Sequence, residues 1–156
     1  MKVRDIMTQP PQTCRRETSL ALASRRMHET GCGMLAVLDS DGRLAGVLTD
    51  RDLAMSIGET RRDAARIAAD KAMSHHVHTC NPDESLHAAL ERMASLHVRR
   101  LPVLDSDGDL KGILSIDDII LWGVVQGGVR ADDLVSALRG ICAPRAIALE
   151  REMPVT

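Results

Sequence analysis

The stretch GVLTDRDL (residues 46–53) has a counterpart, GILSIDDI (residues 112–119), 66 positions further along the chain. Each copy places a glycine, two aliphatic residues, a hydroxyl residue and, three residues after the hydroxyl, an aspartate. This is the pattern of a helix N-terminus, where the hydroxyl caps a first-turn amide and the acid lies near the positive end of the helix dipole. Each copy therefore predicts a cap, and the repetition raises the question of whether it is also a pair of ligand contacts.

The duplication extends well beyond these eight residues. At a constant offset of 66, residues 6–54 match residues 72–120 at 19 of 49 positions without a gap. The longest identical run is VLDSDG, at residues 37–42 and 103–108. The chain is an internal duplication.

Both copies predict a β-α-β-β-α order. A short β segment precedes an amphipathic helix in which Leu, Ala and Met recur at i, i+3 and i+7. Two apolar runs around the DSDG turn then predict a β-hairpin, and a second helix follows. In the first copy, the expected helices are residues 19–29 and a segment beginning at Asp50; in the second, they are residues 85–97 and a segment beginning at Ile116.

One such unit is too small to bury both faces of its sheet, so the two copies should pack together with pseudo-two-fold symmetry in an α+β fold. The expected boundaries are 1–57 for repeat 1, 58–71 for a helical linker, 72–125 for repeat 2 and 126–156 for a C-terminal helix (130–141) and a loose tail.

Composition excludes several function classes. A net charge of −2 argues against non-specific nucleic-acid binding, and Trp122 as the sole aromatic residue leaves no stacking platform for single strands. The N-terminus lacks the apolar run of a signal peptide, and no apolar stretch reaches about 20 residues. We therefore expect a cytoplasmic protein with no membrane or nucleic-acid partner.

The repeated motifs resemble those of a tandem CBS-domain pair, or Bateman module. The resemblance spans roughly residues 2–122, and is carried by RDIMT (4–8), HVRRLPVLD (97–105) and the two opening stretches. The chain is similar to stand-alone bacterial CBS proteins of the hypoxic-response type, and LRGICAP (138–144) adds weaker support. This resemblance implies a regulatory, stress-related module rather than an enzyme.

The residues themselves suit a nucleoside. A carboxylate such as Asp52 can accept hydrogen bonds from the vicinal hydroxyls of a ribose, and aliphatic Val47 and Ile113 suit an adenine ring. The resemblance implies that adenosyl nucleotides bind in clefts between the repeats. It assigns these site residues: Asp52 and Asp118 for the ribose; Thr49, Ser115 and Arg100 near the phosphate; and Thr13, Cys14, Thr79 and Cys80 near the base. Arg51, in the turn of the first copy, is a further candidate to bind the nucleotide.

AMP, ADP or ATP is the expected ligand, with S-adenosylmethionine or NAD as alternatives, and no cofactor is obligatory. The two copies differ in their cations. Arg99-Arg100 in the second repeat corresponds to Gly33-Met34 in the first, whereas Arg51 in the first corresponds to Asp117 in the second. Each candidate site therefore keeps one cationic element, and we expect unequal affinities or one empty site.

The alternative is a ligand-free scaffold that acts through a partner surface, with a regulated protein partner that the sequence does not identify. Apolar residues on an outer helix predict a homodimer with isologous contacts: Ile119, Ile120, Leu121 and Trp122. No pattern of catalytic residues emerges, so we expect no enzymatic activity.

No metal site is expected either. His75, His76 and His78, with Cys80, include possible metal ligands, but repeat 1 has no histidine at the matching positions, which favours a solvated loop. The DSDG runs resemble part of a calcium loop, although a hairpin turn accounts for them. The four cysteines lack C-x-x-C spacing and are expected to be buried small hydrophobic residues: Cys14, Cys32, Cys80 and Cys142.

Overall fold

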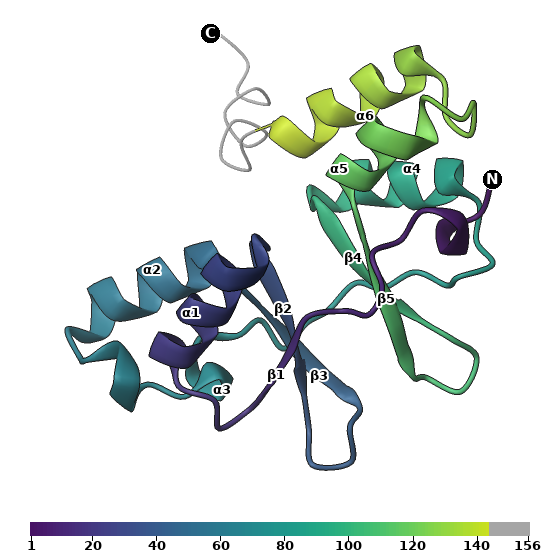
Figure 1. Ribbon diagram of the computed structural model, residues 1–156. Helices are drawn as coiled ribbons and strands as arrows, with labels where there is room; N and C mark the ends of the chain where they lie inside the picture. The colour runs from purple at the N-terminus through teal and green to yellow at the C-terminus, as the bar shows by residue number, and fades with distance from the viewer. Residues whose placement is uncertain (144–156) are drawn as a thin grey trace, which may run out of the picture. The chain divides into compact units, whose positions relative to one another are not determined.

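The computed structural model describes residues 1–143, and the predicted tail lies mostly outside the described residues (Figure 1). The α+β fold is confirmed. The elements are η1 (Val3–Asp5), β1 (Thr13–Arg15), α1 (Leu20–Thr30), β2 (Met34–Leu38), β3 (Leu44–Thr49), α2 (Asp50–Thr60), η2 (Ala64–Arg66), α3 (Ala69–Ala72), α4 (Leu86–Leu96), β4 (Arg100–Leu104), β5 (Leu110–Ser115), α5 (Ile116–Asp118), the π-helical turn η3 (Ile119–Gly123) and α6 (Ala131–Cys142).

The chain forms two compact units, each built from separate segments. The first-repeat unit comprises Gln9–Thr79 and Pro102–Gly112. The second-repeat unit comprises Met1–Thr8, Cys80–Leu101 and the chain from Ile113 onward. The first eight residues of the chain thus belong to the unit that holds most of repeat 2.

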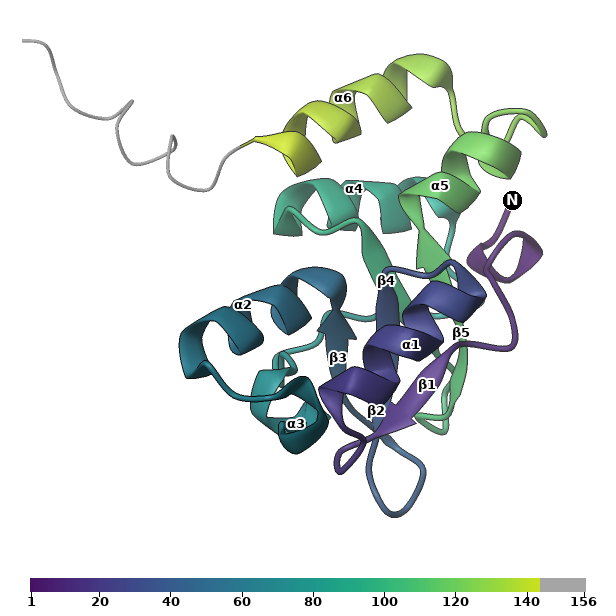
Figure 2. The same ribbon diagram turned by 60° about the vertical axis from the view of Figure 1, so that its left-hand side comes forward.

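In the first-repeat unit, β2 is the central strand, parallel to β1 and antiparallel to β3. The register pairs Cys14 with Val37 and Leu35 with Leu48, all of which are buried. Helices α1, α2 and α3 pack together with this sheet (Figure 2). The predicted i, i+3, i+7 spacing of Leu, Ala and Met along α1 is confirmed, since Leu20, Ala23 and Met27 are all buried in the core.

The second-repeat unit places α4 against α6 (Figure 1). Leu86, Ala89 and Met93 of α4 are fully buried, as the periodicity predicted. A Cβ on Gly140 of α6 would lie 3.2 Å from the Ala94 carbonyl oxygen, so this glycine allows a close helix contact. The C-terminal helix predicted at residues 130–141 is confirmed as α6.

Residues 58–71 do not form the continuous helix that their composition favoured. The α2 helix ends at Thr60, and a 3-10 turn (η2) and the short α3 follow. The linker backbone instead forms hydrogen bonds with the first residue of α1 and with the chain just before it. The Leu20 amide donates to the Ile67 carbonyl (2.8 Å), and the Ala69 amide donates to the Thr18 carbonyl (2.8 Å). These tertiary hydrogen bonds replace helical ones and override the local helix propensity.

The helix predicted from Ile116 also differs from expectation. After three α-helical residues the chain enters the π turn, in which the Val124 amide donates to the Ile119 carbonyl (3.0 Å). Ile119 is fully buried, so its placement on an outer face was wrong. Within the described residues, no helix combines the length and apolarity that a bilayer crossing requires.

Candidate functional site

Each unit pairs the opening segment of one repeat with the last strand of the other. In the second-repeat unit, Thr8 and Ile113 exchange two backbone hydrogen bonds of 2.9 and 3.1 Å. In the first-repeat unit, Ser74 and Val47 exchange bonds of 2.9 and 3.1 Å. Ser74 is the counterpart of Thr8, and Ile113 of Val47, at the offset of 66. Both units therefore build the same arrangement from residues of both repeats.

A complete capping box lies beside each of these pairings. In the first-repeat unit, Asp52 Oδ2 accepts from the Thr49 amide (2.8 Å) and hydroxyl (2.7 Å), and the Asp52 amide donates back to Thr49 Oγ1 (3.2 Å). Ser115 and Asp118 repeat this geometry in the second-repeat unit, at 2.7, 2.6 and 3.1 Å. The predicted helix caps are confirmed. We call the surroundings of Thr49 and Asp52 the first site, and those of Ser115 and Asp118 the second site.

In each unit, a backbone hydrogen bond holds the segment that precedes the hairpin next to the capping box. The Ile116 amide donates to the Arg99 carbonyl (2.9 Å), and the Asp50 amide donates to the Gly33 carbonyl (3.3 Å). The arginine pair of repeat 2 therefore flanks the second site, whereas Gly33 and Met34 flank the first site. Sequence comparison predicted this difference between the two copies.

The candidate cations are available for a ligand. Arg51 is exposed in the first turn of α2, and Arg100 is half-buried at the start of β4. Within residues 1–143, neither guanidinium group has a hydrogen-bonding or ion-pair partner. Arg99 Nη2 lies 4.0 Å from Cys142 Sγ. Each site thus holds at least one cation that could meet a phosphate.

Sequence reasoning missed Thr8, which lies beside Asp118 at the second site. Its hydroxyl donates to Asp118 Oδ1 (3.2 Å), so it contacts the acid assigned to the ribose. Thr8 and Ser74 are both hydroxyl residues at matching positions of the two repeats, which is a signal that the sequence does contain. The sequence does not show, however, which strand each of them pairs with.

The residues assigned to the base lie partly in the core. Thr13 and Thr79 are half-buried, and Cys14 and Cys80 are only 3% and 4% exposed. Burial raises the pKa of the Cys14 thiol from 9.0 to about 11 and that of Cys80 to about 12, with Glu17 and Glu84 adding smaller increases. Both side chains therefore remain neutral thiols, and a base contact through their backbone stays a prediction. Cys32 is partly exposed and Cys142 is exposed, so the expectation that all four are buried was wrong.

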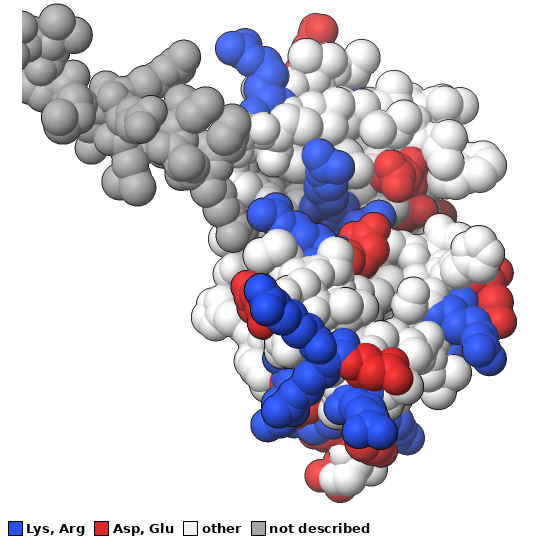
Figure 3. All heavy atoms as spheres, turned by 90° about the vertical axis from the view of Figure 1, so that its left-hand side faces the viewer, with Lys and Arg blue, Asp and Glu red and all other residues white. Residues whose placement is uncertain are grey.

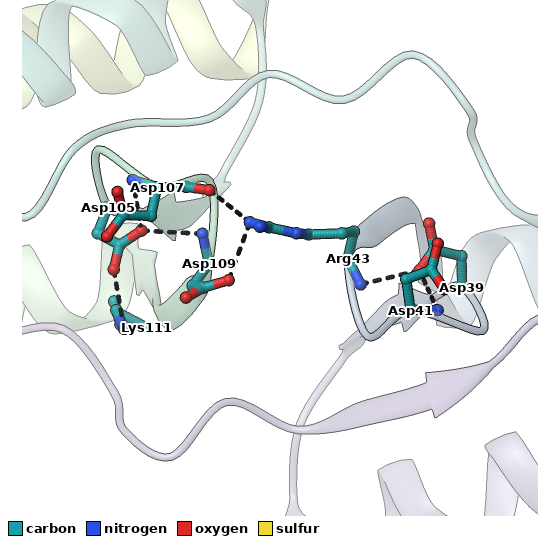
Figure 4. Close-up of polar contacts among 7 residues, drawn as sticks. All are labelled: Asp39, Asp41, Arg43, Asp105, Asp107, Asp109 and Lys111. Atoms are coloured by element: carbon teal, nitrogen blue, oxygen red, sulfur yellow. Dashed lines mark hydrogen bonds and ion pairs between the residues drawn. The ribbon is translucent and has the colours of Figure 1, made fainter.

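In each acidic hairpin turn, the first aspartate accepts hydrogen bonds from backbone amides of the same turn (Figure 4). Asp39 Oδ1 accepts from the amides of Asp41 (3.0 Å) and Arg43 (2.9 Å), and Asp105 Oδ1 does the same for Asp107 and Asp109. Lys111 pairs with the other Asp105 oxygen at 2.8 Å, and this hydrogen bond is the main cause of the lowered pKa of Asp105. The two turns are joined by the Arg43 guanidinium, which lies 2.9 Å from Asp109 Oδ1 and donates to the Asp107 carbonyl.

No group of three or more His, Cys, Asp or Glu side chains is placed to hold a metal ion within the described part of the chain. The His76 and His78 rings meet edge to face, with centroids 5.2 Å apart. In the linker of the first-repeat unit, Arg62 and Arg66 line a surface hollow together with Asp63. On the face that Figure 3 presents, Lys and Arg gather but are interspersed with Asp and Glu, so they form no continuous basic surface there.

The sequence model of the CBS domain matches residues 3–59 and 66–125, and the chain therefore belongs to the CBS domain family. It is 32% identical over 117 residues to the CBS domain-containing protein YhcV of Bacillus subtilis, a match that covers 75% of this chain and 81% of YhcV. An uncharacterized protein of Methanopyrus kandleri is 30% identical over 75% of this chain, which spans only 57% of that protein.

Solved structures with the same fold include ligand complexes. Hypoxic Response Protein I, solved with two coordinated zinc ions, is 28% identical (TM-score 0.70; 78% of this chain and 98% of that one). CBSX2, solved in complex with AMP, is 26% identical (TM-score 0.70; 81% and 98%). A CBS domain pair solved with 5′-methylthioadenosine and S-adenosyl-L-methionine is 24% identical (TM-score 0.72; 82% and 97%), which shows the shared fold.

Proposed function

We propose that the protein is a regulatory module that binds adenosine nucleotides at the first and second sites. The observation that carries this proposal is the duplicated box, in which one oxygen of each aspartate accepts the capping hydrogen bonds and the other takes no part in them. A carboxylate oxygen accepts hydrogen bonds from ribose hydroxyls, and charged acceptors make the stronger bonds of this kind. The adenosine ligands of related CBS pairs support the proposal.

The cations favour nucleotides that carry phosphate. Arg51 at the first site and Arg100 at the second provide guanidinium groups suited to phosphate oxygens. The sulfonium of S-adenosylmethionine would be repelled by the same groups, so we place AMP, ADP and ATP ahead of it. NAD, whose pyrophosphate is flanked by two nucleosides, would require a longer groove.

Thermal unfolding across a ligand panel tests the function. A ligand at about 100 times its dissociation constant stabilises the folded state by ~2.7 kcal/mol, which corresponds to a rise in Tm of roughly 5–11 °C for a chain of this size. We expect this rise with at least one of AMP, ADP and ATP, and a smaller one with S-adenosylmethionine. Stoichiometric zinc, which belongs in the panel because of Hypoxic Response Protein I, should give no specific stabilisation.

Arginine variants identify where the phosphate binds. Arg51→Gln and Arg100→Gln should each reduce the nucleotide shift, because each removes a cation from one site. Arg62→Gln is the matched control, since it removes the same charge from the hollow beside Asp63 and should leave the shift unchanged. If no adenosine ligand shifts the wild-type Tm at millimolar concentration, the ligand-free scaffold replaces this proposal.

We also propose that the protein forms a homodimer. Apolar side chains of η3 and its continuation are exposed, with Leu121 59%, Trp122 53% and Val125 77% accessible. They lie close in sequence on one segment of the second-repeat unit, and clustered exposed apolar groups of this kind mark association surfaces.

A further inference from the structure

Thr8 distinguishes the second site from the first. Its hydroxyl donates to Asp118 Oδ1 (3.2 Å), while Asp118 Oδ2 already accepts two hydrogen bonds from Ser115. The two backbone bonds between Thr8 and Ile113 fix the position of the threonine, so the contact does not depend on a loose loop.

The first site lacks this contact. Ser74 occupies the equivalent place and is held by the same pair of backbone bonds, to Val47. Asp52 Oδ2 accepts two hydrogen bonds from Thr49, as Asp118 does from Ser115. Within residues 1–143, however, Asp52 Oδ1 accepts no hydrogen bond, from Ser74 or from any other residue.

The number of free acceptor positions therefore differs between the sites. A carboxylate oxygen accepts about two hydrogen bonds, so Asp52 Oδ1 has room for both hydroxyls of a ribose diol. Asp118 Oδ1 has room for one while Thr8 keeps its bond. A second ribose hydroxyl can bind Asp118 only if it displaces the threonine.

We propose that Thr8 is a specificity-determining residue of the second site, which lowers its affinity for a ribose diol by competing for Asp118. This inference rests on the proposed nucleotide binding and adds which site is weaker and why. The second site should depend mainly on one ribose hydroxyl, whereas the first should depend on both. Displacement of one hydrogen bond to a charged group corresponds to about a tenfold loss of affinity.

The test uses titration calorimetry with AMP on full-length variants that keep one aspartate. Asp52→Asn isolates the second site, and adding Thr8→Val removes the competing hydroxyl while keeping the β-branched shape. We expect this addition to tighten AMP binding about tenfold. In the Asp118→Asn protein, Ser74→Ala is the matched control and should change AMP affinity less than twofold.

A deoxynucleotide separates competition from a structural effect. AMP lacking the 3′-hydroxyl should bind the isolated first site about tenfold more weakly than AMP, but the isolated second site only slightly more weakly. Thr8→Val should make the second site as sensitive as the first. If Thr8→Val leaves AMP binding unchanged or weakens it, the proposed role of Thr8 is overturned but the proposed function is not. If the wild type binds no AMP, the proposed function itself is overturned.

Discussion

Thr49 and Asp52 are bound to each other by three hydrogen bonds of 2.7 to 3.2 Å, which use both backbone amides, the Thr49 hydroxyl and a single carboxylate oxygen of Asp52. The helix cap and the candidate ligand contact therefore involve the same aspartate but different carboxylate oxygens. The box fixes the carboxylate through Oδ2 and leaves Oδ1 for a ligand. The structural role explains the pattern in the sequence, and the remaining oxygen gives it a second possible use.

Removing a capping hydroxyl should cost stability in the ligand-free protein. Thr49→Ala and Ser115→Ala each delete the acceptor of a first-turn amide, and we expect each to lower the free energy of unfolding by about 1 kcal/mol. Thr49→Ser keeps the hydroxyl and should lose much less. Urea titration measures these differences, and equal losses for Thr49→Ser and Thr49→Ala would contradict the capping role.

Two glycines should respond to alanine in opposite directions. A Cβ at Gly46 would lie 2.7 Å from Met73 Sδ and 2.8 Å from the Ser74 carbonyl oxygen, so Gly46→Ala should destabilise the protein by about 1–3 kcal/mol. Gly58 lies in α2 with open space around it, and Gly58→Ala should stabilise the protein by up to about 1 kcal/mol. Thermal unfolding compares the stabilities of the two variants. If Gly46→Ala leaves the stability unchanged, residues 73 and 74 do not approach Gly46 of β3 as closely as the structure shows.

The sequence was sufficient for much of this architecture because the decisive signals are local and repeated. The capping boxes, the hairpins around VLDSDG and the buried faces of α1 and α4 all follow from periodicities that each repeat carries. The difference between Arg99-Arg100 and Gly33-Met34 was also visible, since it needs only the constant offset.

The remaining features depend on contacts between distant segments. Thr8 and Asp118 are 110 residues apart, and nothing in either stretch indicates their pairing. The linker conformation is set by hydrogen bonds to the start of α1 and the chain just before it, against the helix propensity of the linker residues. The π turn that follows α5 departs from the α-helix expected there, whereas buried Ile119 matches its buried counterpart Leu53 in repeat 1.

The four cysteines should differ widely in reactivity. With a pKa of about 11 in place of 9.0, the Cys14 thiolate is roughly a hundredfold rarer at pH 8, and that of Cys80, at about 12, is rarer still. Iodoacetamide should therefore label exposed Cys142 first and leave Cys14 and Cys80 nearly unlabelled, as peptide mass spectrometry would show. Rapid labelling of Cys14 in the folded protein would contradict its burial.

The same thiols predict a pH dependence of stability. Because folding raises their pKa, the folded state holds its protons more tightly, so stability is unaffected below pH 9 and falls as the pH rises toward 11. Cys14→Ala with Cys80→Ala should flatten this alkaline decline, although the double variant will be less stable at neutral pH. Unfolding curves between pH 8 and pH 11 measure the slope, and an equal decline in both proteins would exclude these thiols as its source.

Association should depend on the exposed apolar segment. We expect the wild type to sediment as a dimer at micromolar concentration, and Leu121→Lys with Trp122→Lys to yield a 17.0 kDa monomer. Gln126→Lys adds charge to the same segment without removing apolar surface and should remain dimeric. A wild type that sediments as a monomer would refute the dimer and leave this surface exposed.

The central claim is that Asp52 and Asp118 bind the ribose of an adenosine nucleotide, and calorimetric titration of AMP tests it most directly. Asp52→Asn with Asp118→Asn keeps the shape of both side chains but removes the charge that strengthens their hydrogen bonds. Because each such bond contributes roughly 1.5–3 kcal/mol, we predict saturable AMP binding to the wild type and affinity at least tenfold lower in the double variant. AMP binding of equal strength to both proteins, or no binding to the wild type at millimolar AMP, would contradict the claim.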